Sequence, residues 1–280
     1  LSHIFPIFAK TKPYTMKTRI LYLLLALSLV LPELKAKVND SVDAVLKELD
    51  AVIQQKDKYT LPKEAELTVL RSRLKHAKDS RQKYELCDKL FSSYLHYQAD
   101  SALAYVEKKR ELLPLLNEPL LEQELIINSA EVMGVMGMYS WAEELLSQVK
   151  PETLTPSLLG YYYRTVRANY GWFADYLINK DLKEYYQTQA HIYRDSIMLT
   201  TTPGIDHDIV EAEKLMVEGE IERSMEILNR LSENNPDLRQ QAFINYTLAE
   251  VYGLQGDVDS QIYRLALTAI ADLKFGTREY

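Results

Sequence analysis

The residue types that most often carry out catalysis are sparse in this chain and widely separated. Cys87 is the single cysteine among 280 residues, and His76, His96 and His191 stand alone. Zinc sites need His or Cys in close pairs, and the chain has no His-Glu-x-x-His motif. A glycine-rich phosphate loop and a nucleophile elbow are also missing from the sequence. The sequence therefore predicts a non-catalytic protein with no metal site and no cofactor.

His207 is the histidine with acidic neighbours on both sides, Asp206 and Asp208. Two carboxylates beside an imidazole could bind a metal weakly. Acidic residues soon after Gly204 also suit the first turn of a helix, where they interact favourably with the helix dipole. We favour the second interpretation, which predicts that these carboxylates cap the helix that follows Gly204.

Ten aromatic residues occur between positions 161 and 193. One helix face cannot bury all of them, so two interpretations stay open. In the first, the rings fill a wide interface between helices. In the second, some of them line a concave groove, because exposed aromatic and arginine side chains anchor protein partners. The candidate residues of this partner groove are Tyr162, Arg164, Arg167, Asn169 and Tyr170.

Helices must position these residues, and the stretch 211–236 shows how. Apolar side chains recur there at intervals of three and four residues on both sides of Gly219. A glycine at that point suits a helix end with a left-handed residue, so the stretch predicts a helical hairpin. The same arrangement recurs around Gly137 and Gly256.

Aligning the three corner glycines reveals further shared positions. An alanine stands seven places before each, where two helices must approach closely. Two places after each stands a larger residue, Ile221 and Val258 among them, which is expected to lock the second helix onto the first. Five places after each the residue is small, except that Gln261 departs from the pattern. The residues predicted to pack the repeat are Ala130, Gly137, Tyr139, Ala142, Ala212, Gly219, Ser224, Ala249 and Gly256.

This pattern resembles the tetratricopeptide repeat, whose units of about 34 residues stack helical hairpins into a solenoid. The corner glycines are 82 residues apart from Gly137 to Gly219 and 37 apart from Gly219 to Gly256, so the units are long and divergent. The resemblance is clear for residues 119–274 and weaker for residues 62–118. It implies an all-α fold, a superhelical stack of antiparallel helix hairpins.

The residues before position 119 predict four further helices. Apolar residues between Val42 and Ile53 form one stripe, and a polar break then precedes Pro62, which suits the first turn of the next helix. Taken in pairs, the four helices predict two degenerate hairpins. The charged run 107–111 is expected to be solvated surface.

The amino end has the plan of a secretory signal peptide. Residues 16–36 contain Lys17 and Arg19, followed by an apolar run of twelve residues, which is short for a membrane-spanning helix. An uncleaved signal anchor is the alternative. Residues 1–15 are expected to derive from an upstream start or to be disordered. We therefore expect an exported, periplasmic protein with a helical-repeat domain over residues 37–280, continuing beyond residue 280 in the native protein.

The charge of the chain argues against nucleic acid as a partner. Its formal charge is −7, and it is −11 without residues 1–36. An acidic surface repels DNA and RNA. The sequence therefore predicts a protein or peptide partner and no nucleic-acid contact through this segment.

The last predicted helix, residues 257–274, has an apolar face too broad for one preceding neighbour. Because a repeat stack needs a polar outer face at its end, we expect either a homodimer through this helix or a continuation of the protein. Membrane contact is expected only through a signal anchor or through a span beyond residue 280.

With its export signal, its long divergent repeats and the segment DSALAYVEKKRELL, the chain resembles the extracytoplasmic part of Bacteroidetes membrane regulators. In that group a secreted repeat region precedes a membrane span and a cytoplasmic DNA-binding segment. The resemblance implies a periplasmic sensor or protein-interaction region. A free periplasmic adaptor that organises envelope proteins is the alternative, and a carbohydrate-binding partner of a nutrient transporter ranks last.

Overall fold

The computed structural model describes residues 41–234 and 237–276, so the predicted signal segment and residues 1–15 lie outside the described residues. Within these ranges the regular elements are all helices joined by short turns and loops, and there is no β-strand. Residues 41–54 form the first described helix, named here the N-terminal helix. The elements after it are α2 (Lys56–His76), α3 (Ser80–Tyr94), α4 (Ala99–Leu116), α5 (Pro119–Val135), α6 (Tyr139–Leu146), η1 (Pro151–Thr153), α7 (Pro156–Tyr176), α8 (Lys180–Thr200), α9 (Ile205–Val217), α10 (Ile221–Glu233), α11 (Leu238–Gln255) and α12 (Val258–Phe275).

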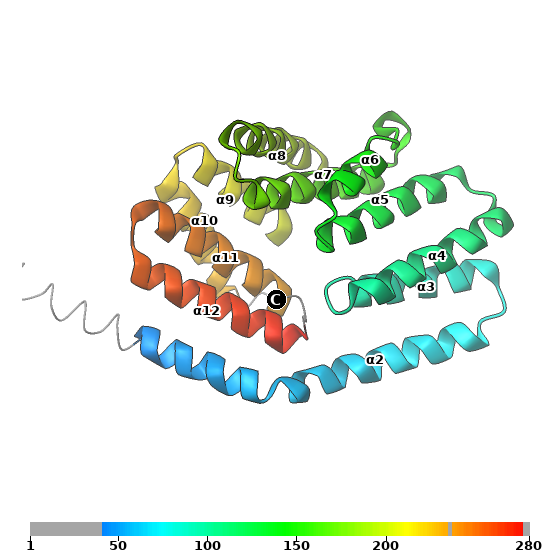
Figure 1. Cartoon of the computed structure of the whole chain (residues 1–280), viewed down its shortest axis with the longest axis horizontal. Helices are drawn as coiled ribbons and strands as arrows, with labels where there is room; N and C mark the ends of the chain where they lie inside the picture. Colours follow the sequence, from blue (N-terminus) through cyan, green and yellow to red (C-terminus); the bar gives the residue numbers. More distant parts are fainter. Residues whose placement is uncertain (1–40, 235–236, 277–280) are drawn as a thin grey trace, which may run out of the picture.

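From α3 onward the helices pack in consecutive pairs, α3 with α4, α5 with α6, α7 with α8, α9 with α10 and α11 with α12. Each pair also contacts the next one. For example, α4 packs against α5, and α8 packs against α9. Figure 1 shows these hairpins following one another along a curved path. The all-α stack of helical hairpins predicted from the repeat is confirmed.

Three hairpin corners share one backbone geometry. Gly137, Gly219 and Gly256 have φ angles of 77°, 83° and 72°, in the left-handed region that residues with a Cβ rarely adopt. In each corner the amide of the residue after the glycine donates to the carbonyl five positions before it, at 2.8, 2.8 and 3.0 Å. This bond is the one that closes a Schellman motif, and it satisfies a carbonyl at the helix end.

The buried apolar side chains form successive clusters along the chain. One joins α2, α3, α4 and α5 around Leu90, a second joins α5, α6 and α7 around Ile127, and a third joins α9, α10 and α11 around Leu228. Each cluster is shared by neighbouring hairpins. The stability of the stack therefore comes from packing within each hairpin together with contacts between successive units, as in other repeat proteins.

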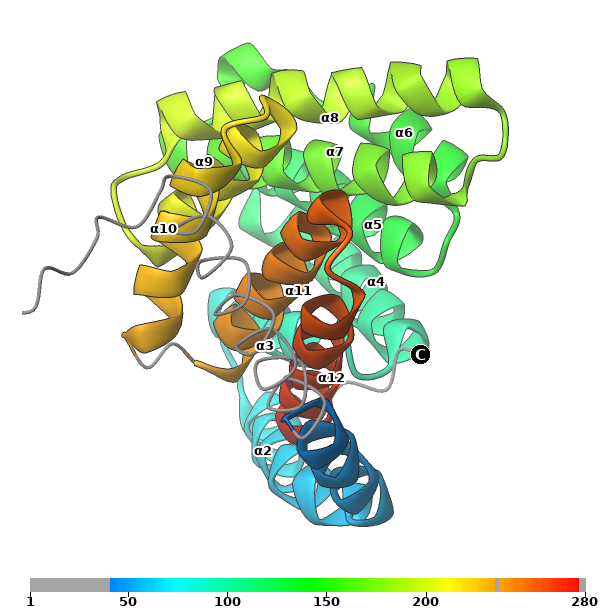
Figure 2. The same cartoon turned by 90° about the vertical axis from the view of Figure 1, so that its left-hand side faces the viewer.

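The two ends of the described chain meet. Val45 and Val52 of the N-terminal helix pack against Ile270 and Leu273 of α12 in a fourth buried cluster. At the same contact, the Nζ atom of Lys274 lies 3.0 Å from a carboxylate oxygen of Glu48. Both Figure 1 and Figure 2 show the N-terminal helix beside α12.

This contact covers part of the apolar face of the last helix, while Ile262 and Leu265 on α12 remain 38% and 42% exposed. The face predicted to meet a second copy or a further segment is partly covered by the N-terminal helix. The homodimer through this helix and the continuation of the protein both stay predictions.

The first two helices do not form the predicted hairpin. The break falls at Gln55, where the chain bends, and α2 runs onward from the N-terminal helix without folding back beside it (Figure 1). Pro62, expected to begin a helix, lies inside α2. One proline removes a single backbone hydrogen bond. Burial of Leu67 and Leu70 in the cluster shared with α3 offsets that loss, so the helix runs through.

Replacing Val45 by Asp should open the contact between the chain ends, because an unpaired carboxylate cannot be buried there without a large desolvation cost. We expect the melting temperature to fall by about 5 °C or more. Amide hydrogen exchange in residues 258–275 should become faster. Ala44→Asp adds the same charge at an exposed position of the same helix and should change neither measurement. Unchanged exchange in V45D would contradict the end-to-end contact.

Candidate functional site

The five predicted groove residues lie on different sides of α7. Tyr162 and Asn169 are buried, with 7% and 1% of their surface exposed. Arg164 is exposed, whereas Arg167 and Tyr170 are half-buried. Burial contradicts partner contact for Tyr162 and Asn169, because interior side chains have no access to a partner in this conformation. The five residues therefore do not form one continuous groove.

Most rings of the aromatic run pack against one another between α7 and α8. The ring centroid of Tyr170 lies 5.5 Å from that of Tyr186 and 5.8 Å from that of Tyr193. Phe173 lies 4.6 Å from Tyr186. Burial raises the pKa of the Tyr162 and Tyr170 hydroxyls above the ordinary tyrosine value. For these rings the structure supports the first interpretation, a wide interface between helices.

Other aromatic side chains surround a hollow of about 460 Å³ at the turns of the α5–α6 and α7–α8 hairpins. Trp141 and Tyr176 are 59% and 76% exposed. The ring of Tyr139 lies 5.4 Å from Phe173 and 6.0 Å from Tyr176, which holds the wall of the hollow in place. We name Met138, Tyr139, Trp141, Phe173 and Tyr176 the aromatic corner. Exposed apolar groups gathered in this way are typical of interaction sites.

A buried lysine lies among acidic groups from neighbouring helices. Lys109 of α4 is fully buried. Its Nζ atom lies 2.5 Å from a carboxylate oxygen of Asp88, 2.7 Å from one of Glu124, and 2.7 Å from the amide oxygen of Asn128. The ring of Tyr84 lies 4.6 Å from the same ammonium group. The three oxygen atoms and the ring replace the hydration that the ammonium loses on burial.

The burial of Lys109 contradicts the expectation that the charged run 107–111 is solvated surface. Lys109 follows Ala102 and Tyr105 at spacings of seven and four residues, which places it on the buried face of α4. That spacing indicates burial of Lys109 from the sequence alone. The alternating charges of the run point the other way, because they normally mark an exposed helix face.

The Lys109 cluster adjoins a cleft of about 660 Å³ between α3, α5 and α7. Asn128 donates to the hydroxyl of Tyr161 at 2.9 Å, and this hydroxyl donates to Glu131. Burial raises the pKa of the Glu131 carboxyl. Arg164, the exposed member of the predicted groove, lines the same cleft.

A second cleft, of about 640 Å³, lies between the α7–α8 and α11–α12 hairpins beside α9, and we name it the α7–α11 cleft. Arg167 and Arg194 both pair with the carboxylate of Glu213, with Arg194 Nε at 3.4 Å. Asp175 and Glu250 line the same cleft. Of these side chains, the sequence singled out Arg167 alone. Glu213 and Arg194 lie on other helices, so the spacing of residues around Arg167 could not indicate them.

Glu250 titrates in an unusual range for a carboxyl group. Its side chain lines the α7–α11 cleft and keeps contact with solvent. Partial desolvation by the surrounding helices, together with the charges of Glu213 and Asp175, raises its pKa to about 7. Arg167 and Arg194 act in the opposite direction. Burial and the neighbouring Arg167 lower the pKa of the Arg194 guanidinium.

Gln261, the departure from the small-residue pattern, also lines the α7–α11 cleft. Its amide lies over Gly253, where an added Cβ would come within 2.6 Å of the Nε2 atom. Gly134 has the same place relative to its corner glycine, and there a Cβ would lie 3.1 Å from the ring of Trp172. A second glycine three residues before the corner glycine therefore indicates, in the sequence, that a side chain of a neighbouring helix packs closely against the backbone there.

The predicted small packing residues lie inside the hairpins. The hydroxyl of Ser224 donates to the carbonyl of Ala212 across the α9–α10 hairpin at 2.8 Å. Val258, expected to lock the last hairpin, is instead 58% exposed. It is the first residue of α12, where the helix has only begun to pack. The buried small residues are Ala130, Ala142, Ala212, Ser224 and Ala249.

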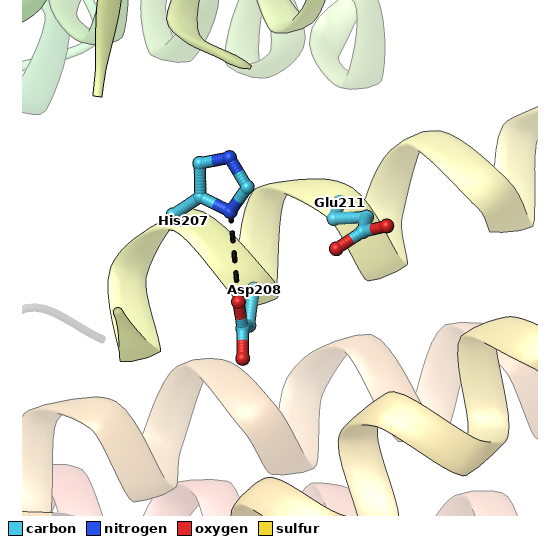
Figure 3. Close-up of side chains that lie close together, drawn as sticks. All are labelled: His207, Asp208 and Glu211. Atoms are coloured by element: carbon cyan, nitrogen blue, oxygen red, sulfur yellow. Dashed lines mark ion pairs between the residues drawn. The ribbon is translucent and has the colours of Figure 1, made fainter. Parts of the chain in front are cut away.

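Figure 3 shows His207, Asp208 and Glu211 along one stretch of α9. One possible ligand atom from each lies within 4.8 Å of the others. The carboxylate of Asp208 is 3.5 Å from His207 Nδ1 and 3.1 Å from a guanidinium nitrogen of Arg230. Since an arginine already neutralises this carboxylate, the group gives no ground for proposing a metal site.

The cap predicted for this helix does not form through side chains. The N-cap residue of α9 is Gly204, and in the described structure no side chain caps this helix. Asp206 and Asp208 lie in the first turn. Asp206 accepts a hydrogen bond from Gln240 of α11 at 3.3 Å. The carboxylates of Asp206 and Asp208 therefore accept hydrogen bonds from side chains of α11 and α10, and not from backbone amides at the start of α9.

The hairpins, their glycine corners and their local cores define a tetratricopeptide-type helical-repeat domain. Over residues 53–280 the chain matches the family described as the SusR N-terminal TPR domain. The chain belongs to this family, and its resemblance to the N-terminal region of Bacteroidetes regulators is confirmed. A search of curated proteins found no match. The coarse function that follows is a helical-repeat, protein-interaction region of a regulator.

Among the described helices, none combines the length and the apolar character that crossing a membrane would need.

Replacing Lys109 by Met should leave Asp88 and Glu124 without their shared cation. Removing one partner of a buried ion pair costs about 3–5 kcal/mol, and we expect about 3 kcal/mol because both carboxylates keep some contact with water. The free energy of unfolding in urea measures this loss. Lys108→Met, at the exposed neighbouring position, should cost less than about 1 kcal/mol. Equal stability of the two variants would contradict the role of the cluster.

The raised pKa of Glu250 predicts a dependence of stability on pH. The folded state holds this proton more tightly than an unfolded chain, where the pKa is near 4.5, so the stabilisation is complete below that value. It is lost as the pH rises through about 7. Glu250→Gln should therefore gain stability relative to the wild type between pH 5 and pH 8, measured by urea unfolding. A stability difference that stays constant over this range would contradict the raised pKa, and Glu226→Gln, at an exposed position of α10, is the control.

Proposed function

We propose that this segment is the periplasmic sensor and protein-interaction region of a membrane-anchored regulator. Its membership of the SusR N-terminal TPR family supports a regulator. The signal-peptide pattern of residues 16–36 supports export. The observation that carries the partner-binding role is the aromatic corner, where Trp141 and Tyr176 remain largely exposed around a hollow.

The aromatic corner suits a protein partner for two physical reasons. Trp and Tyr supply large contact areas with few rotatable bonds, which is why they dominate binding energy in protein interfaces. Tyr139 and Phe173 already stack on one another, so this wall needs little ordering when a partner binds. An apolar side chain of the partner would fill the hollow.

The position of the corner also suits signal transmission. It joins the turns of two successive hairpins, α5–α6 and α7–α8, so a bound partner would restrain the angle between them. A ligand shifts a conformational equilibrium only by its difference in affinity for the two states. A contact that bridges two repeat units provides such a difference.

A free periplasmic adaptor is the alternative function, and it would use the same surface. The two differ in attachment to the membrane. Cells are fractionated, and the protein is detected with an antibody against the repeat domain. A product longer than this chain that stays with membranes after carbonate extraction supports the regulator. A product of the length of this chain in the soluble periplasm would overturn the membrane-anchored regulator in favour of the adaptor.

Replacing Trp141 by Ala should weaken partner binding by tenfold or more while the melting temperature changes little, because the side chain is an exposed anchor. A photo-crosslinking residue at Met138 reports partner contact in cells, and W141A should reduce the yield of its adduct. Leu199→Ala, exposed on α8, is the matched control. An adduct yield at Met138 that W141A leaves unchanged would count against the aromatic corner. Tyr162→Ala should instead destabilise the fold by about 3 kcal/mol.

A further inference from the structure

The α7–α11 cleft holds more carboxylates than cations. The charged side chains that line it are Asp175 of α7, Arg194 of α8 and Glu250 of α11. Glu213 of α9, which pairs with Arg194, and Arg167 of α7, its second partner, lie beside this lining. Glu213 engages both guanidinium groups. Within the described ranges, neither Asp175 nor Glu250 has an ion-pair partner. When Glu250 is ionised, one negative charge in the group has no counterpart.

The rest of the lining is suited to an aliphatic chain. Gly171, Ala174 and Ala190 leave space on α7 and α8 because they have little or no side chain, and no atom lies within 4 Å of a Cβ built on Gly171. Met216 and Leu254 add apolar surface. Lysine and arginine bury their methylene stems along such surfaces while their charged ends contact carboxylates.

An exposed apolar face borders the cleft on α11. Phe243 and Tyr246 are each 43% exposed, and Leu254 is 68% exposed. These residues and Glu250 recur at spacings of three and four, so they share one face of the helix. A small free amine would leave this face uncovered, whereas the residues on either side of a basic side chain in a polypeptide could cover it.

We infer that the α7–α11 cleft receives one lysine or arginine side chain from a partner polypeptide. The charged end would lie against Asp175 and Glu250, the stem over the apolar lining, and the flanking residues on Phe243 and Tyr246. The inference rests on the proposed function, because it identifies how the protein partner is recognised. The acidic balance of the whole chain, −7, favours a basic partner through long-range attraction.

Two fluorescent peptides of the sequence Gly-Ala-Leu-Ala-X-Ala-Leu-Ala-Gly test the inference by anisotropy with the full chain. X is lysine in one and norleucine in the other, so they differ in the charged group and share the stem. At pH 8 and low salt the lysine peptide should bind about tenfold more tightly. This preference should weaken at pH 6, where Glu250 is largely protonated, and in 0.5 M salt.

Variants assign the effect to the cleft. Glu250→Gln should reduce the affinity for the lysine peptide about tenfold and leave the norleucine peptide unchanged. Asp175→Asn should also reduce the affinity for the lysine peptide, and it tests the second carboxylate of the cleft independently. Glu226→Gln should leave both affinities unchanged, because its side chain is exposed on α10 outside the cleft.

Three results would overturn the inference. These are equal binding of the two peptides, no binding of either at millimolar concentration, and full displacement of the lysine peptide by an equal concentration of n-butylammonium. The last would assign the cleft to small amines.

Crosslinking in cells separates this inference from the proposed function. An adduct from a photo-crosslinking residue at Met138 with none from one at Tyr246 would overturn the cleft as a partner site and leave the proposed function intact. An adduct at Tyr246 with none at Met138 would leave the cleft as a partner site and overturn the aromatic corner, the contact that carries the proposed function.

Discussion

A stack of helical hairpins has two ends, and each end exposes an apolar face that must be covered. In this chain one face meets the other, because Val45 and Val52 of the N-terminal helix pack against Ile270 and Leu273 of α12. This contact requires the stack to curl through all its units, so every angle between hairpins is constrained by closure. It also covers part of the apolar face of α12. The clefts between hairpins are set by that curvature.

Two buried polar groups act within this frame. Lys109 joins α3, α4 and α5 through Asp88, Glu124 and Asn128, whereas Glu213 joins α7, α8 and α9 through Arg167 and Arg194. Buried ion pairs contribute little net stability compared with apolar packing, but they penalise arrangements that leave a charge unpaired. Each group adjoins a cleft between hairpins. The curved stack thus holds charged side chains at defined positions along its clefts.

The aromatic residues of α6, α7 and α8 show how one residue type serves two purposes. Tyr170, Tyr186 and Tyr193 pack against one another and support the longest hairpin. Trp141 and Tyr176, at the hairpin turns, lie outside that interface and remain exposed. Composition alone could not separate these roles, because every ring has the same preference for burial. Whether a ring is buried or exposed depends on the space available between the helices at its position.

The local architecture follows from short-range patterns in the sequence. Gly137, Gly219 and Gly256 predicted the hairpin corners because a left-handed helix exit depends on the conformation of one residue, and the buried alanines follow from the spacing of a close helix pair. The identity of the partners depends on the tertiary structure: Lys109 meets Asp88 and Glu124, Arg167 and Arg194 share Glu213, and the N-terminal helix reaches α12. These contacts join residues from 15 to more than 200 positions apart. They depend on interhelical angles accumulated over successive hairpins, which no short-range pattern of residues encodes.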